Sequence, residues 1–340
     1  MPRIKIGNKF IGDGQPAFVI AEVAASHEGS LEQAKRLIEA SLEAGADAVK
    51  FQVFQADELV VSSHPKYQIF KELEFSLEQW LELLNYARKL EIIFLADVFD
   101  IPSLELMDSP EVQGYKIHLT NIANPDMLCR IAQTRKPVFL ATGGAKPEEI
   151  GTAIDILKSN GNSDIILMHG YQAYPTKLEE VNLRLMSSLR EMFHLPVGFL
   201  DHVDGGTELA IIVPIIAIAS GACVVEKHIT LDRSLKGSDY FSSLDPPQFQ
   251  LLMNYIREVE TTFGKGDFSF SPEELKYRQE VMKNIVAATP ILKGTRIAPA
   301  MLAFKRSSPG LSPMEAPNLS GKVARFNIAK DEVITWQKVD

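Results

Sequence analysis

Eight short apolar segments, each followed by a turn and an amphipathic stretch, recur along the first three quarters of the chain. They are Phe18–Glu22, Ala48–Gln52, Ile92–Ala96, Gly114–Ile117, Val138–Ala141, Ile165–Met168, Pro196–Phe199 and Cys223–Glu226. Nearly continuous apolar strands that alternate with helices are typical of a parallel sheet covered on both faces. Eight regular units favour closure, and no Gly-x-Gly-x-x-Gly motif of an open dinucleotide-binding sheet follows the first segment. We therefore predict an α/β fold, a (β/α)8 TIM barrel.

The two ends of the chain have sequence patterns that differ from the strand–helix repeat of the barrel. Residues 1–14 alternate polar and apolar positions and turn at Gly7-Asn8, which predicts a β-hairpin that caps the bottom of the barrel. The barrel itself is expected over 15–263, and the Gly, Ser and Pro residues of 264–283 predict a linker. Residues 284–340 contain short β-like pieces and many prolines. They predict a small domain that is close to the lower size limit for a core and should lean on the barrel or on a partner subunit.

Composition and charge exclude several classes of partner. The formal net charge is -9 and no run of Lys or Arg forms a basic footprint, so we expect no nucleic acid. The start of the chain lacks a signal-peptide pattern. The longest apolar run, Leu209 to Ala219, is interrupted by Pro214 and is too short to cross a bilayer, so we expect a cytoplasmic protein without a membrane partner. Cys129 and Cys223 lie in apolar stretches and are expected to be buried structural thiols.

Polar and ionisable residues stand where the predicted strands end. In a barrel of this type the active site forms at that rim. The residues are Glu22, Lys50, Gln52, Asp97, Lys116, His118, Thr142, His169, Gln172, Asp201, His202, Glu226 and His228. Because the opposite face of a barrel has no need of such groups, the pattern predicts an enzyme.

Two histidines at the ends of neighbouring strands, His202 and His228, predict a metal site. Neutral imidazoles with carboxylates and water suit Mn²⁺, Fe²⁺, Co²⁺ or Zn²⁺, and nothing favours Zn²⁺ in the absence of thiolates. Glu22 is the nearest carboxylate, since the first and eighth strands are neighbours in a closed barrel. Asp239, in the loop after the eighth strand, is expected to complete the shell. The alternative is that one of the two histidines is a hydrogen-bonded structural residue.

Two lysines, Lys50 and Lys116, are expected to point into the apolar barrel. A buried ammonium group needs an anionic partner. One interpretation is a pair of salt bridges with Glu22 or Asp97. The other is a phosphate or carboxylate site, to which the backbone amides of 142–144, Thr-Gly-Gly, also contribute.

These residues together resemble the sialic acid synthases, including their relatives that make pseudaminic and legionaminic acids. The tail of the chain resembles the small antifreeze-like (SAF) domain of the same enzymes, a β-rich domain. The matching stretches are Ile20–Glu22, His27–Ser30, Glu43–Gln52, Tyr115–Ile117, Thr142-Gly143, Tyr174–Thr176, Asp201-His202, Glu226–Asp232, Lys305-Arg306 and Gly321–Ala324.

The resemblance implies an enzyme, a transferase, that condenses phosphoenolpyruvate with an open-chain N-acetylated aldose. It implies a divalent metal ion, most simply Mn²⁺, on His202 and His228. It also implies an acid/base role for Glu22 and lysines that grip phosphoenolpyruvate. In a homodimer with a swapped C-terminal domain, Arg306 would reach the partner's active site.

We therefore expect catalytic and substrate-binding residues at this rim. The catalytic residues are Glu22, Lys50, Lys116 and Asp239, and the substrate-binding residues are Gln52, Asp97, Thr142, Gln172, Tyr174, Glu226 and Arg306.

The chain departs from the family pattern where phosphate would bind. Residues 96–99, Ala-Asp-Val-Phe, stand where the family has Ser-Thr-Pro-Phe, so Asp97 adds a negative charge there. Ala141 and Leu200 replace serines. Residues 118–121, His-Leu-Thr-Asn, and 170–172, Gly-Tyr-Gln, also differ from the family. Two alternatives follow: a metal-dependent aldolase or lyase on the same fold that uses a pyruvate-like substrate without phosphate, or a sugar-binding relative without catalysis.

Overall fold

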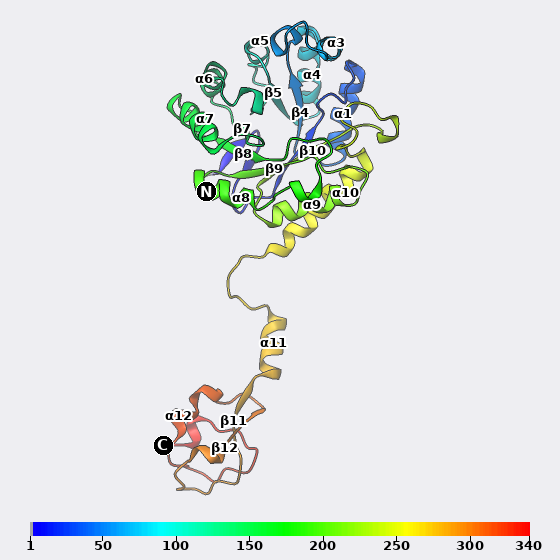
Figure 1. Ribbon diagram of the computed structural model, residues 1–340. Helices are drawn as coiled ribbons and strands as arrows, with labels where there is room; N and C mark the ends of the chain where they lie inside the picture. Colours follow the sequence, from blue (N-terminus) through cyan, green and yellow to red (C-terminus); the bar gives the residue numbers. More distant parts are fainter. Residues whose placement is uncertain (1–2) are drawn as a thin grey trace. The chain divides into compact units, whose positions relative to one another are not determined.

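The computed structural model describes residues 3–340, and its larger part is a closed barrel of eight parallel strands surrounded by helices (Figure 1). The strands follow one another around the barrel in the order β10-β3-β4-β5-β6-β7-β8-β9. Their bounds are β3 Phe18–Glu22, β4 Ala48–Val53, β5 Ile93–Val98, β6 Val112–Ile117, β7 Val138–Ala141, β8 Ile165–His169, β9 Val197–Asp201 and β10 Val224–His228. The predicted (β/α)8 fold is confirmed.

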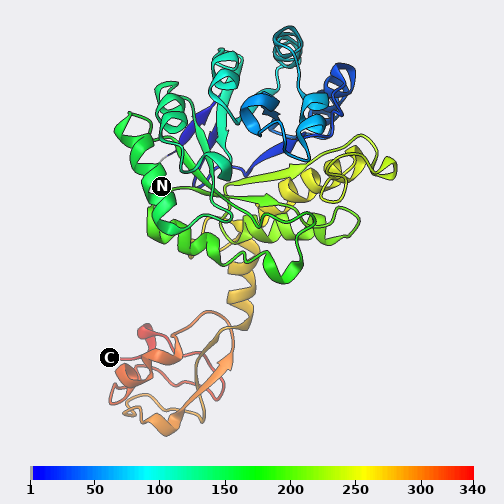
Figure 2. The ribbon, with the colours of Figure 1, turned by 45° about the horizontal axis from the view of Figure 1, so that its top comes forward.

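Helices follow the strands and form the outer layer, as the view in Figure 2 also shows. They are α1 Leu31–Glu43, α2 Ala56–Leu59, α3 Tyr67–Leu73, α4 Leu77–Lys89, α5 Ile101–Leu106, α6 Pro125–Gln133, α7 Pro147–Ser159, α8 Leu185–Phe193, α9 Leu209–Ala219 and α10 Pro246–Glu260. Side-chain caps fix several of the starts. Ser30 accepts a hydrogen bond from the amide of Gln33 at the start of α1, and Ser76 forms a complete capping box at the start of α4. Within residues 3–340, every helix is too short or too polar to span a lipid bilayer.

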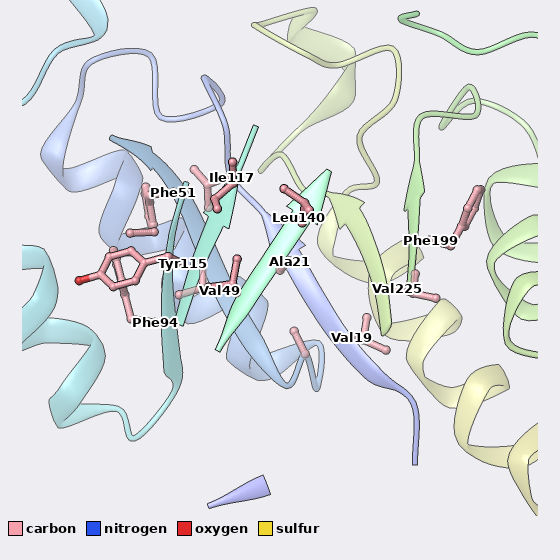
Figure 3. Close-up of a cluster of buried hydrophobic side chains, with 14 of the residues drawn as sticks. Val19, Ala21, Val49, Phe51, Phe94, Tyr115, Ile117, Leu140, Phe199 and Val225 are labelled. Atoms are coloured by element: carbon pink, nitrogen blue, oxygen red, sulfur yellow. The ribbon is translucent and has the colours of Figure 1, made fainter. Parts of the chain in front are cut away.

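Alternation along the strands sorts the side chains into two layers. Val19, Ala21, Val49 and Phe51 point toward the helices and belong to the large outer core (Figure 3). The residues between them, such as Ile20, point into the barrel and form a separate inner core. The same alternation therefore decides which polar residues at the strand ends enter the barrel.

A hairpin of β1, Ile4–Ile6, and β2, Lys9–Ile11, contributes to the inner core. Ile4, Ile6 and Ile11 are buried together with Phe18 and other inward-facing side chains at the amino ends of the strands. Apolar side chains thus close that end of the barrel interior, and polar groups are left at the opposite end.

The contacts divide the chain into two compact units, one ending at Gly264 and the other formed by Lys265–Asp340. The second unit holds α11 Pro272–Val281, α12 Ala316–Leu319, and an antiparallel pair, β11 Lys283–Ala287 with β12 Leu302–Arg306. Its own core contains Ile285, Ile291, Ile297 and Ile328, among others. The stretch 264–283, expected as a linker, therefore contains a helix. A capping box between Ser271 and Glu274 starts that helix.

The two cysteines are free and only partly buried, not enclosed as the sequence predicted. Cys223 donates a hydrogen bond from its Sγ to the carbonyl of Val197 at 3.3 Å. Burial of the Sγ atom raises the pKa of this thiol to about 12, which favours the protonated form at neutral pH.

Candidate active site

Five ionisable side chains enter the barrel together at the carboxyl ends of its strands. We call Glu22, Lys50, Asp97, Lys116 and Glu226 the ion cluster; all five are buried. Each stands two residues after another inward-facing position of its strand. Because side chains alternate along a strand, this spacing places all five in the barrel interior.

Both lysines of the ion cluster are paired with carboxylates. Lys50 Nζ contacts Glu22 and lies 3.1 Å from Glu226 Oε1 and 3.5 Å from Asp97 Oδ2. Lys116 Nζ lies 2.7 Å from Glu226 Oε1 and 3.4 Å from Asp97 Oδ2. The expected salt bridges with Glu22 and Asp97 are present, and Glu226 is a third partner that the sequence did not single out for this role.

The carboxylates of the ion cluster differ in their electrostatics. Burial raises the pKa of Glu22 to about 7 against the opposing effect of Lys50. For Glu226, burial also favours the protonated form, but Lys116 and Lys50 outweigh it and hold the pKa well below its usual range. The carboxylates in turn overcome the effect of burial on Lys116 and raise its pKa. The ion cluster thus combines an ionised Glu226 with a Glu22 that exchanges its proton near neutral pH.

The remaining sector of the interior is apolar. Ala141 on β7, Met168 on β8 and Leu200 on β9 are buried and belong to the inner core. At the level of the ion cluster, the inward-facing side chains are therefore charged on β10 and β3 to β6 and apolar on β7 to β9. Ala141 and Leu200 are two of the positions where the sequence departs from the family pattern.

His202 and His228 lie beside each other at the ends of β9 and β10, as predicted. Their ring centroids are 5.4 Å apart, and Tyr174 packs edge-on against His202 at 4.5 Å. His202 Nδ1 lies 2.9 Å from the carbonyl of Tyr171. Since a carbonyl only accepts, this contact places the proton on Nδ1 and leaves Nε2 with a free lone pair.

The chemistry of the two imidazoles fits a divalent metal ion. Burial lowers the pKa of both His202 and His228 to about 3, so both rings are neutral. His228 Nδ1 is buried and has no hydrogen-bond partner. Among residues 3–340, no three His, Cys, Asp or Glu side chains are arranged to hold a metal together. The contribution of Glu22 or Asp239 to a metal shell therefore stays a prediction. The residues fit a metal held by two imidazoles, with its other ligands from water or substrate.

A buried ion pair lies behind the histidines. Lys227 Nζ is 2.7 Å from Asp201 Oδ2 and 3.1 Å from the carbonyl of Val203. Lys227 and Asp201 alternate with His228 and His202 along β10 and β9, so the pair is on the outer side of the barrel. The pair ties together the two strand ends that carry the histidines. The sequence could have predicted this ion pair, because Asp201 directly precedes His202 and Lys227 directly precedes His228.

The other predicted site residues are distributed as follows. Gln172 accepts a hydrogen bond from the Tyr174 hydroxyl at 2.8 Å, next to His202. Thr142 bonds to the carbonyl of Met168, and Gln52 lies in register with Asp97 on the neighbouring strand.

Two further predicted residues lie outside the strands of the barrel. Asp239, at φ +59°, accepts a hydrogen bond from the amide of Ala25 at 3.3 Å, and burial raises its pKa. Arg306 is exposed at the end of β12, in the second unit.

Comparison with known proteins points to one group of relatives. The NeuB family model matches residues 37–268, and the SAF domain model matches residues 284–340. The chain is 35% identical to N,N'-diacetyllegionaminic acid synthase of Legionella pneumophila, covering 98% of each chain. It is 31% identical to N-acetylneuraminate-9-phosphate synthase of Homo sapiens, covering 98% of this chain and 95% of the relative.

A solved structure agrees with this result. The N-acetylneuraminic acid synthetase of Leptospira borgpetersenii, in complex with citrate, matches with a TM-score of 0.76 at 32% identity. The match covers 82% of this chain and 97% of the other. The sequence relatives and the structural relative therefore support the same fold and the same resemblance that the motifs indicated.

Proposed function

The chain belongs to the NeuB family, and from this membership we propose that it condenses phosphoenolpyruvate with the open-chain form of an N-acetylated aldose. The observation that carries the proposal is the buried ion cluster beside two neutral histidines at the mouth of the barrel. The relatives named as synthases of legionaminic acid and of N-acetylneuraminate phosphate support the class of product. In this proposal the enzyme is a transferase.

The proposed reaction forms one carbon–carbon bond and releases phosphate. Carbon 3 of the enolpyruvate attacks the aldehyde carbon of the aldose, and the aldehyde oxygen takes up a proton. Water adds at carbon 2, the bond from carbon 2 to the bridging oxygen breaks, and inorganic phosphate leaves. Loss of the hydroxyl proton at carbon 2 completes a 2-oxo acid.

Within this reaction we assign the acid/base role to Glu22, because its carboxyl group exchanges a proton near neutral pH. Lys50 and Lys116 face the anionic donor and offset the charge of Glu226. Asp239, Tyr174 and the other predicted rim residues would position the two substrates.

His202 and His228 would hold a divalent metal ion, most simply Mn²⁺, which when bound supplies Lewis-acid polarisation of the aldehyde oxygen. The chain contributes the conditions for this. Burial keeps both imidazoles neutral, the carbonyl of Tyr171 fixes the proton of His202 on Nδ1, and Asp201 with Lys227 ties the strand ends together.

We also propose that the enzyme is a homodimer with swapped C-terminal domains. The support is the match to the SAF domain and the exposed position of Arg306 at the end of β12. In such a dimer Arg306 would enter the partner's active site and contact substrate.

A second candidate function is a metal-dependent aldolase or lyase that uses a pyruvate-like substrate without phosphate. Asp97 adds a negative charge beside both lysines, and Ala141 and Leu200 offer no hydroxyl groups. These features favour a donor of lower charge.

The test is a phosphate-release assay with phosphoenolpyruvate, Mn²⁺ and a panel of N-acetylated hexosamines. The proposal expects phosphate release that requires both phosphoenolpyruvate and one of the aldoses. No turnover with the whole panel, together with no thermal shift on adding phosphoenolpyruvate, would overturn it. Turnover with pyruvate instead would select the second candidate. Binding of an aldose without any turnover would indicate a sugar-binding protein.

A further inference from the structure

Lysines that can bind an anion inside the barrel are few. The buried cations of residues 3–340 are Lys50, Lys116 and Lys227. Lys227 is on the outer side of the barrel and is bonded to Asp201 and to a backbone carbonyl. A phosphate group that is bound by lysine within the interior therefore depends on Lys50 and Lys116.

The positive charge of these two lysines is already offset. Three carboxylates, those of Glu22, Asp97 and Glu226, surround two ammonium groups. Asp97 is the carboxylate that lies nearly equidistant from both, with its Oδ2 3.5 Å from Lys50 Nζ and 3.4 Å from Lys116 Nζ. Fully enclosed as it is, Asp97 acts in a low-dielectric environment, where like charges repel strongly.

The free acceptors of the ion cluster are also unsuited to phosphate. Asp97 Oδ1 and Glu226 Oε2 are buried and have no hydrogen-bond partner. A buried acceptor needs a donor, and a sugar hydroxyl, an amide N–H or water supplies one. The fully ionised phosphate group of phosphoenolpyruvate has only acceptors to offer, so next to Asp97 Oδ1 it adds repulsion and supplies no donor.

We propose that Asp97 is a specificity-determining residue that weakens the binding of phosphate dianions to the Lys50–Lys116 pair and favours a hydrogen-bond donor in their place. The inference deepens the proposed function, since it concerns the affinity of the same site for phosphoenolpyruvate. It does not require turnover.

The experiment measures the binding of phosphoenolpyruvate, and separately of inorganic phosphate, by isothermal titration calorimetry of the full-length protein. Asp97→Asn removes the charge and keeps the shape, and Asp97→Ala removes the side chain in case the amide disturbs folding. Asp126→Asn, which neutralises an exposed aspartate on α6, is the matched control.

We expect both Asp97 variants to bind phosphoenolpyruvate at least tenfold more tightly than the wild type and Asp126→Asn to bind it as the wild type does. The double variant Asp97→Asn with Lys116→Met should lose the gain, because the gain depends on the lysine pair. Folded Asp97 variants that bind phosphoenolpyruvate no more tightly than the wild type would overturn the inference, including the case in which none of the proteins binds it. These measurements report binding, so they do not depend on turnover. A lack of turnover with phosphoenolpyruvate would contradict the proposed function, and the effect of Asp97 on binding could still be measured.

Discussion

Lys116 Nζ on β6 lies 2.7 Å from Glu226 Oε1 on β10, four strands away around the eight-stranded barrel. The ion pair therefore joins opposite walls of the interior. Both side chains are buried, so their charges depend on each other and on Lys50 and Asp97. The pair links β6 to the strand that carries His228.

Replacing Lys116 with Met should lower the free energy of unfolding by about 3–5 kcal/mol, because it leaves three buried carboxylates with Lys50 as their one lysine partner in the ion cluster. Replacing Glu226 with Leu in the same protein should recover part of this loss. Urea unfolding of the two single variants and the double variant gives the coupling energy. Strictly additive losses would contradict a direct interaction across the barrel.

Acid should destabilise the protein through a buried histidine outside the metal site. His27 packs against Phe75 at 4.5 Å between ring centroids, and burial lowers its pKa to about 4 from 6.5. Between pH 6.5 and about 4, His27 therefore binds a proton in the unfolded chain and stays neutral in the folded chain. Stability contributed by the neutral ring is present above pH 6.5 and is lost as the pH falls toward 4, by up to about 3 kcal/mol.

The measurement is the free energy of unfolding from pH 7 to pH 4.5 in the wild type and in His27→Gln. The variant should show a shallower decline below pH 6.5. His64→Gln, which changes an exposed histidine, is the control and should keep the slope of the wild type. Equal slopes in all three proteins would show that His27 is not the group responsible.

The pair of Lys227 and Asp201 should position the metal ligands. Lys227→Met frees the ends of β9 and β10, so we expect Mn²⁺ affinity to fall about 10–100-fold, as for other groups that orient ligands. Titration with Mn²⁺ followed by electron paramagnetic resonance measures this directly, with Asp126→Asn as control. Unchanged affinity in a folded Lys227→Met protein would assign the pair a structural role only.

Removing either histidine should abolish the metal-dependent activity. For His202→Ala and His228→Ala we expect turnover to fall on the order of a hundredfold or more, because a Lewis acid contributes several kcal/mol to such steps. A chelator should inactivate the wild type to the same level, and added Mn²⁺ should restore only the wild type. Full activity after chelation would exclude a metal-dependent mechanism.

Arg306 should affect catalysis and leave stability intact. The residue is exposed, so Arg306→Ala should change the free energy of unfolding by no more than about 0.5 kcal/mol. In the proposed dimer it should lower turnover at least about tenfold. Arg325→Ala, another exposed arginine of the second unit, is the matched control. Light scattering should give the mass of a dimer. A wild-type protein that is monomeric, and whose turnover still falls on Arg306→Ala, would contradict the swapped arrangement.

The barrel was predictable because its signal is periodic. Eight apolar strands and the alternation within them fix which side chains enter the interior, so the meeting of Glu22, Lys50 and Asp97 follows from strand order and parity. The convergence of His202 and His228 follows from the adjacency of β9 and β10 in the same way.

What the sequence did not reveal depends on contacts with no residue-type signature. The partner of His202 is a backbone carbonyl, that of Tyr171, which any residue could supply. Glu226 contacts both Lys50 and Lys116 because the closed barrel brings their strands together. The separation of these residues along the chain does not predict the distances between their side chains. Helix α11 was missed because the Gly- and Ser-rich approach to Ser271 dominated the pattern of a short, highly exposed helix.

The most direct test of the account is to identify the product formed from phosphoenolpyruvate and an N-acetylated hexosamine in the presence of Mn²⁺. We expect one molecule of phosphate for each molecule of a 2-oxo acid whose mass, measured by mass spectrometry, equals that of the aldose plus pyruvic acid. We also expect that Glu22→Gln and His202→Ala form neither. Two results would contradict this expectation. One is hydrolysis of phosphoenolpyruvate to phosphate and pyruvate without the 2-oxo acid. The other is formation of the same 2-oxo acid when pyruvate replaces phosphoenolpyruvate as the donor.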